Sequence, residues 1–480
     1  MPIRTFVLII SDAWKADCNM KAEELYKKML GVSINYFLVD IRKDRDDFYS
    51  LTQNELNENK LLLSGFVLNL IMDGELEKAT ELINSLPEND VMRIGLTIVN
   101  PAITWREFIS AIESLKKTNR HLKSVILTAG RPNLLNGFND FTRIGPLLET
   151  HKKLFIEDFK YIYEEKICPA LYDLCLAEYY YQQNRIFDAE ILVSRTIREF
   201  DVDSERRLLF AALYLQSKIL IVHGRTVNAE SYIKEIRRYV KKNGEAEFSY
   251  NIDSAEALCA MYEGNYQLIS AWFQKKSPDE YADFNMLDLY RYMIKMRCYI
   301  FMKDYMAVIA LAEKLRPLLI AGRRHMDICE IELLLAMSFY YAQKKEMAFQ
   351  ALDRALKIAK RRRYYRLIAD EGEMMLHVLI SYANEKGQTP FLMQIIEMTR
   401  DMAISHPLYL KAQYKNTHTF TQMEIAILKL LEQGKSKEEI GEYFFISINT
   451  VKYHMKKIYA KLGASSTHQA VWQAKRIGII

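Results

Sequence analysis

The chain has 480 residues, half of them hydrophobic, so it is long enough for about three domains with cores of their own. Its 17 glycines and 10 prolines are about half the usual share, which indicates a mostly helical fold and excludes collagen-like and disordered classes. The net charge of +5 is uneven, because residues 417–480 hold nine Lys and Arg against five Asp and Glu. A basic excess confined to a short segment is typical of a domain that binds nucleic acid.

The cysteines and the apolar runs indicate in which cellular compartment the protein is expected. The six cysteines form no CxxC pair, so the sequence contains neither a zinc motif nor a redox motif. The longest apolar stretch, residues 61–72, is interrupted by polar side chains and is too short to span a membrane. The apolar run at residues 6–10 is shorter than a signal-peptide core. We therefore expect a cytoplasmic protein without a membrane partner. No catalytic grouping, metal site or cofactor motif can be recognised, so we do not expect an enzyme.

The first 150 residues are the least regular part of the chain. Within residues 1–50, two apolar runs fit either strands or helices, and we favour helices. Residues 64–87 predict a helical hairpin with Gly74 in its turn and Ala79 opening its second helix. Residues 127–141 are rich in Gly, Pro and Asn, which predicts a structured loop.

A helix, a short polar turn and a second helix then recur with a period of about 40 residues. Each copy has a small or aliphatic residue near the start of its second helix, and these anchors are 40, 40, 39 and 40 positions apart. The anchors are Ala189, Ala229, Ile269, Val308 and Ala348. Apolar residues also recur four positions after and nine positions before each anchor. Because such a hairpin cannot bury its apolar face alone, the copies are expected to stack into an α-superhelix. The pattern resembles tetratricopeptide (TPR) repeats, whose period is about 34.

The last 64 residues predict four short helices, each with a polar residue at its start. Three pairs have the spacing of a capping box, in which a hydroxyl and a Glu or Gln satisfy the free N–H groups of the first turn. These pairs are Thr421 with Glu424, Ser436 with Glu439, and Ser466 with Gln469, and Ser447 caps a further helix. The expected helices are 421–432, 436–443, 447–461 and 466–476. The short connection between the second and third helices predicts a helix-turn-helix.

The third of these helices has two different faces. One face is a predicted core stripe of Val451, Met455, Ile458 and Leu462. The opposite face has no acid and carries Asn449, Tyr453, Lys456, Lys457 and Ala460, with Lys452 on its flank. Lysines attract DNA phosphates, and an Asn can pair with adenine.

Residues 420–480 resemble the LuxR (GerE, FixJ) family of DNA-binding domains. The resemblance rests on the segment from Phe420 to Ser466 and includes Glu439, Ile446, Ser447, Thr450, Val451, Lys452, His454 and Gly463. It implies a third helix in the major groove of double-stranded DNA, where Lys452, Tyr453 and Lys456 stand at the contact positions of the family. Together with the exposed face of the helix, this makes the candidate DNA contacts Asn449, Thr450, Lys452, Tyr453, Lys456 and Lys457. It also implies a homodimer interface on the last helix, at Val471 and Ala474. Gly441 departs from the common Ala of the family, at a cost of about 1 kcal/mol unless a close helix crossing requires it.

Helical repeats followed by a LuxR-type domain resemble the MalT-type regulators, as does the segment at 369–379. Members of that group usually begin with an ATP-binding domain, and none is recognised here. The single Gly-Lys-Ser, at 434–436, lacks the first P-loop glycine and opens a helix of the predicted helix-turn-helix. The expected divisions are a helical region at 1–150, a TPR-like array at 151–365, a helical connector at 366–415 and the DNA-binding domain at 416–480.

The sequence thus predicts an all-α bacterial transcription regulator that senses an unidentified small molecule, peptide or protein through its helical repeats. The alternative is a TPR-type scaffold whose helix-turn-helix-like domain binds protein. A third hypothesis is a regulator that assembles with a separate ATPase. The basic run at 360–366 fits either a solvated helix end or a second contact with the DNA backbone.

Overall fold

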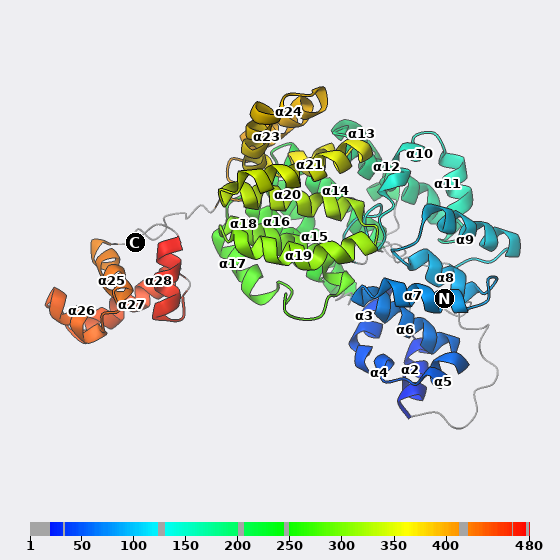
Figure 1. Cartoon of the computed structure of the whole chain (residues 1–480), viewed down its shortest axis with the longest axis horizontal. Helices are drawn as coiled ribbons and strands as arrows, with labels where there is room; N and C mark the ends of the chain where they lie inside the picture. The colour runs from blue at the N-terminus through cyan, green and yellow to red at the C-terminus, as the bar shows by residue number, and fades with distance from the viewer. Residues whose placement is uncertain are drawn as a thin grey trace. The chain divides into compact units, whose positions relative to one another are not determined.

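The computed structural model describes residues 20–31, 34–122, 130–199, 206–243, 249–411, 421–462, 464–476 and 480. The chain divides into two units, Met1–Ala412 and Gln413–Ile480 (Figure 1). Every regular element of the described residues is a helix, and an isolated bridge between Asn136 and Asp140 is the single extended pairing within these ranges. The predicted all-α fold is therefore confirmed. None of the described helices is both long and apolar enough to cross a membrane.

The first unit begins with a group of helices around its own core. Residues 36–41, one of the two ambiguous runs, lie in a helix as predicted, whereas residues 6–10 lie outside the described residues. The predicted hairpin is formed by α6 and α7, with Gly74 at a φ of 82° and Ala79 fully buried. The helices of this region are α2 (Met20–Gly31), α3 (Ile34–Lys43), α4 (Arg45–Tyr49), α5 (Gln53–Glu58), α6 (Lys60–Asp73), α7 (Leu76–Ser85), α8 (Val91–Val99) and α9 (Trp105–Thr118).

Five helical hairpins form the centre of the unit, and helices of successive hairpins contact one another (Figure 1). They pair α12 (Cys168–Gln182) with α13 (Ile186–Glu199), α14 (Arg206–Val222) with α15 (Thr226–Asn243), α16 (Ser249–Tyr262) with α17 (Tyr266–Lys275), α18 (Leu289–Phe301) with α19 (Tyr305–Ala321), and α20 (His325–Tyr341) with α21 (Lys345–Arg362). Each predicted anchor is the fourth residue of its second helix, and all five anchors have 0% exposure. The anchors are therefore packed between the two helices of each hairpin, and alanine at three of them allows a close approach.

The turns of these hairpins share one conformation. The residue five positions before each anchor is in the left-handed region, with φ between 60° and 73°. The five residues are Asn184, Gly224, Gly264, Lys303 and Gln343. In each turn the next N–H donates to a carbonyl five residues earlier, over 2.8–2.9 Å, as in Arg185 to Tyr180 and Lys344 to Phe339. This is the Schellman arrangement that ends a helix and satisfies its last carbonyl groups.

The segment from Gly130 to Ile144 lies against the repeat helices and is the structured loop that the sequence predicts. Its Leu134 N–H donates to Glu178 of α12 over 2.7 Å, and its Gly130 carbonyl accepts from the N–H of Tyr290 over 3.1 Å. A side chain at Gly130 would meet the Met286 carbonyl, which explains the glycine by close packing. This part of the chain continues through η1 (Thr142–Ile144), α10 (Gly145–Leu148), α11 (Lys152–Phe159) and η2 (Glu165–Ile167).

After the last hairpin the chain folds back onto the array. The helices α22 (Tyr365–Ala369), α23 (Gly372–Lys386) and α24 (Pro390–Ser405) follow α21. Beyond them, the Nε2 of His406 is 2.6 Å from the carbonyl of Ile221 in α14, and the ring of Tyr409 stacks on Tyr262 at 4.2 Å. The predicted division into 1–150, 151–365, 366–415 and 416–480 stays a prediction, since the structure itself divides only near residue 412.

Candidate nucleic-acid interface

The described residues of the second unit form four helices, α25 (Gln422–Glu432), α26 (Lys437–Phe444), α27 (Ile448–Leu462) and α28 (Thr467–Arg476). Two of the predicted capping boxes form completely. The hydroxyl of Thr421 accepts from the Glu424 N–H over 3.2 Å while the Glu424 carboxylate accepts from the Thr421 N–H over 2.8 Å. Ser436 and Glu439 exchange the same two bonds over 3.1 and 2.8 Å. These bonds fix where α25 and α26 begin.

The start of α28 differs from the predicted capping box by one residue. The hydroxyl of Ser466 accepts from the Gln469 N–H over 3.2 Å, as expected. The side-chain oxygen of Gln469, however, accepts from the N–H and hydroxyl of Ser465 rather than from Ser466. The start of α28 is still capped, because two of the N–H groups there have hydrogen-bond partners.

The predicted core stripe of α27 is confirmed. Its four members, Val451, Met455, Ile458 and Leu462, are 0–5% exposed and pack with Ile427, Leu428, Leu431, Ile440, Ala470 and Ala474. This core leaves the opposite face of α27 turned to solvent. Asn449, Lys452, Tyr453, Lys456 and Lys457 are exposed there.

Two candidate contacts on this face have partners within the helix. Thr450 is half-buried, and its N–H donates to the Ser447 hydroxyl over 3.2 Å, so it completes the cap of α27. The Nζ of Lys457 lies 4.5 Å from the centre of the Tyr453 ring, a cation–π contact. Since α27 itself contains no acid, every charged side chain that the helix places on this face is basic.

Gly441 is explained by the turn between α26 and α27. Phe445 in that turn has a φ of 54°, and the Ile446 N–H donates to the Gly441 carbonyl over 2.9 Å. A Cβ at Gly441 would lie 2.9 Å from the Ile446 carbonyl oxygen, closer than real Cβ contacts come. Gly441 therefore permits a close crossing of α26 and α27. This is the condition under which the sequence analysis expected a glycine here. The sequence did not single out Phe445, whose side chain is 96% exposed beside this turn.

The position of Ala474 in α28 does not fit the predicted dimer interface. Ala474 is fully buried in the core of its own unit, so its side chain offers no surface to a second copy. Val471 is half-buried against the same core. The large apolar side chain that α28 exposes is Trp472, at 53%.

Comparisons with known proteins agree with this geometry. Residues 418–474 match the family of bacterial regulatory proteins described as the luxR family. The C-terminal unit is a LuxR-type helix-turn-helix domain. Residues 164–385 match the MalT-like TPR region, so the repeats that precede the LuxR-type domain are also of a known kind.

Individual relatives share these two parts. The chain is 23% identical to the HTH-type transcriptional regulator MalT of Klebsiella pneumoniae (strain 342) over 295 residues, which is 57% of this chain and 32% of that protein. It is 45% identical to the transcriptional regulatory protein LiaR of Bacillus subtilis over 58 residues, 12% of this chain and 28% of LiaR. It is 35% identical over 69 residues to the HTH-type transcriptional regulator AlkS of Ectopseudomonas oleovorans, 14% of this chain and 8% of AlkS. The match thus spans about a third of the MalT relatives.

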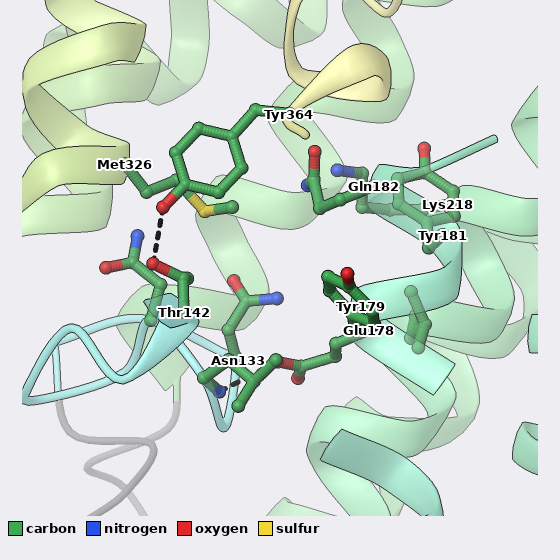
Figure 2. A pocket seen from close by; sticks show the side chains of 12 residues that line it. Asn133, Thr142, Glu178, Tyr179, Tyr181, Gln182, Lys218, Met326 and Tyr364 are labelled. Atoms are coloured by element: carbon green, nitrogen blue, oxygen red, sulfur yellow. Dashed lines mark hydrogen bonds between the residues drawn. The ribbon is translucent and has the colours of Figure 1, made fainter. Parts of the chain in front are cut away.

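The MalT-like region also contains a small pocket of about 30 Å³, which has room for about two water molecules (Figure 2). Its walls come from the 130–144 segment and from α12, α14, α20 and Tyr364. The lining residues are Asn133, Leu135, Asn136, Thr142, Glu178, Tyr179, Tyr181, Gln182, Leu215, Lys218, Met326 and Tyr364. Figure 2 shows the bond between the hydroxyls of Thr142 and Tyr364 that closes one side. The sequence missed this pocket because its residues come from positions more than 200 apart.

Glu178 lines this pocket, and its carboxylate is already hydrogen-bonded. Its two carboxylate oxygens accept from the N–H groups of Leu134 and Leu135 over 2.7 and 2.8 Å. Burial raises the pKa of Glu178 to about 7, although these two N–H groups oppose the rise. The side chain therefore joins the loop to α12 and is not free to bind a ligand as an anion.

Proposed function

We propose that this protein is a transcription regulator that binds double-stranded DNA through its LuxR-type domain and receives a signal through its MalT-like repeats. The observation that supports it most is the exposed, acid-free face of α27, which lies opposite the buried stripe of the same helix. The relatives named above are themselves described as transcriptional regulators. On this proposal the protein is not an enzyme, and it acts in the cytoplasm, where bacterial DNA is.

Within α27 the proposed roles differ among the candidate residues. Asn449, Lys452 and Tyr453 stand near its N-terminal end, the part of a recognition helix that reaches base edges. Lys456 and Lys457 lie one turn later and are assigned to the phosphate backbone. Thr450 is bonded to Ser447, the cap of the helix, through both its N–H and its hydroxyl, and contributes little direct contact. A homodimer on DNA would use other exposed surface of α28 than Ala474.

The test is selection of the full chain against a pool of random DNA duplexes, followed by a salt titration on the enriched sequences. We expect a short motif to be enriched and the binding constant to fall steeply with salt, because phosphate contacts release counterions. A variant with both Lys452→Ala and Lys456→Ala, which removes two exposed charges without touching the core, should lose the enrichment. Absence of any motif with the native chain would contradict the proposal and favour the protein-binding scaffold.

A further inference from the structure

Three large apolar side chains are exposed around the turn that joins α26 to α27. They are Tyr443, Phe445 and Ile448, which lie within six residues of one another. Single exposed apolar residues are common on protein surfaces, whereas several in one place mark a surface that contacts a partner. Because Ile448 is the first residue of α27, it is the member of this group that stands next to the proposed DNA-binding face.

Helix stability alone would not select an isoleucine at this position. Ile448 is 40% exposed and so is not part of the buried core of its unit. Acidic side chains stabilise the start of a helix, because the free N–H groups there carry partial positive charge. The first turns of α25 and α26 contain such acids, Glu424 in one and Glu438 and Glu439 in the other, but the first turn of α27 has none. A β-branched residue is also less favourable in a helix than an unbranched one.

Ile448 is continuous with the proposed DNA-binding face of α27. It precedes Asn449 in the chain and lies one helical turn before Lys452, and both of these residues are exposed. Side chains of a helix lean toward its N-terminus, so a residue of the first turn reaches past the end of the helix. In a recognition helix, this N-terminal end is the part that meets base edges. Ile448 is therefore placed to contact a base.

The charges on α27 favour DNA over a protein as the partner of Ile448. The exposed Lys452 and Lys456 follow Ile448 on this helix, which contains no acid. An apolar group beside cations matches the major groove, where methyl groups of the bases lie between two rows of phosphates. An apolar protein surface would instead remove water from the two lysines without supplying negative charge, which is unfavourable.

We infer that Ile448 contacts the C5-methyl group of a thymine in the major groove and makes the protein prefer thymine at that position. The thymine methyl is the apolar group that base pairs present in this groove, and the other groups there are hydrogen-bond donors and acceptors. Since an isoleucine side chain can neither donate nor accept a hydrogen bond, the methyl group is the partner that it favours. The inference rests on the proposed DNA-binding function and adds to it a base preference at one position of the DNA site.

The experiment uses the full chain and a duplex with the sequence that the native protein enriches from the random pool. Each thymine is replaced in turn by deoxyuridine, which removes the methyl group and leaves the base pairing unchanged. We expect one replacement to weaken the binding of the native chain about fourfold, the loss that corresponds to one buried methyl group. Ile448→Ala should weaken binding to the unmodified duplex by about fourfold or more, and the same replacement should then have no further effect.

Tyr443→Ala is the matched control. It truncates another exposed apolar side chain, on α26 instead of α27, and should leave the effect of the deoxyuridine replacement unchanged. The thermal transition of the C-terminal unit should be the same in Ile448→Ala as in the native chain, because the Ile448 side chain lies outside the core. A weakened binding of Ile448→Ala would then reflect a lost contact with DNA and not a loss of folding.

Three outcomes would overturn the inference and leave the DNA-binding proposal standing. In the first, no thymine of the enriched sequence is sensitive to the loss of its methyl group. In the second, the sensitive thymine stays sensitive in Ile448→Ala, so another residue reads it. In the third, Ile448→Ala and Tyr443→Ala lose the sensitivity alike. If the native chain enriches no sequence at all, the DNA-binding proposal and this inference are both wrong.

Discussion

Arg131 donates to Glu330 over 2.9 Å, although the two residues stand 199 positions apart in the chain. Both side chains are buried, and the pair is part of a larger group. Arg131 also pairs with Asp327, and Arg297 bonds Glu330 over 2.7 Å and pairs with Glu371. These alternating charges attach the loop after α9 to α18, α20 and the start of α23. They make that loop an integral part of the repeat unit.

Glu330→Gln should destabilise the first unit by about 3–5 kcal/mol, because it leaves the buried guanidinium groups of Arg131 and Arg297 without their shared carboxylate. The measurement is the free energy of unfolding in urea. Glu313→Gln, an exposed acid of α19, is the control and should change this free energy by less than about 0.5 kcal/mol. Similar losses in both variants would contradict the assigned role of the buried carboxylate.

The lowered pKa of Glu330 predicts how the stability of the first unit depends on pH. Burial acts to raise the pKa of Glu330, but Arg131 and Arg297 outweigh it and hold the pKa at about 2, below the ordinary 4.5. A carboxyl group with a lowered folded-state pKa contributes stability above its unfolded-state pKa, and that stability is lost as the pH falls from 4.5 toward 2. Urea midpoints measured from pH 6 down to pH 3 should therefore fall more steeply for the native chain than for Glu330→Gln. Parallel curves would show that Glu330 does not titrate in this way.

The hairpin turns provide a prediction of increased stability. Lys303 and Gln343 have φ values of 60° and 62°, where a side chain is strained and glycine is not. Lys303→Gly and Gln343→Gly should each raise the free energy of unfolding by about 0.5–1 kcal/mol. In the reverse test, Gly224→Ala should lower it by about 1 kcal/mol, since a Cβ at Gly224 meets no atom within 4 Å and only the backbone conformation changes. Thermal melts of the three variants check this, and a lower melting temperature for the two glycine variants would contradict it.

The sequence predicted the features that depend on neighbours along the chain. Ala189 and its equivalents were identifiable because the repeat presents the same contact every 40 residues, and Thr421 because its cap lies three positions away. The pairing of Arg131 with Glu330 was not identifiable, because only the fold brings those two segments together. Ala474 was misplaced because a helix pattern shows that a face is apolar but not whether its own unit or a second copy covers it.

Gly441→Ala tests the close crossing in the LuxR-type domain. Alanine favours a helix over glycine by about 1 kcal/mol, yet the added Cβ would lie 2.9 Å from the Ile446 carbonyl oxygen. We expect the close contact to outweigh the higher helix propensity of alanine. The variant should therefore lose about 1–3 kcal/mol of unfolding free energy. Glu442→Ala, an exposed change in the same helix, is the control. Both are compared by the thermal transition of the C-terminal unit, and a stabilised Gly441→Ala would show that the turn can move aside.

Lys456→Ala tests the proposed face of α27. Lys456 is exposed, faces away from the Val451 stripe and forms no ion pair within the described part of the chain, so its removal should not disturb the fold. If it contacts a phosphate, the variant should bind every DNA sequence more weakly, and the slope of log K against log salt should become shallower by about 1. Lys429→Ala removes another exposed charge, from α25, and should leave both quantities unchanged. Equal affinity and equal slope for Lys456→Ala and the native chain would remove Lys456 from the interface, whereas equal losses in both variants would show that only the net charge of the domain matters.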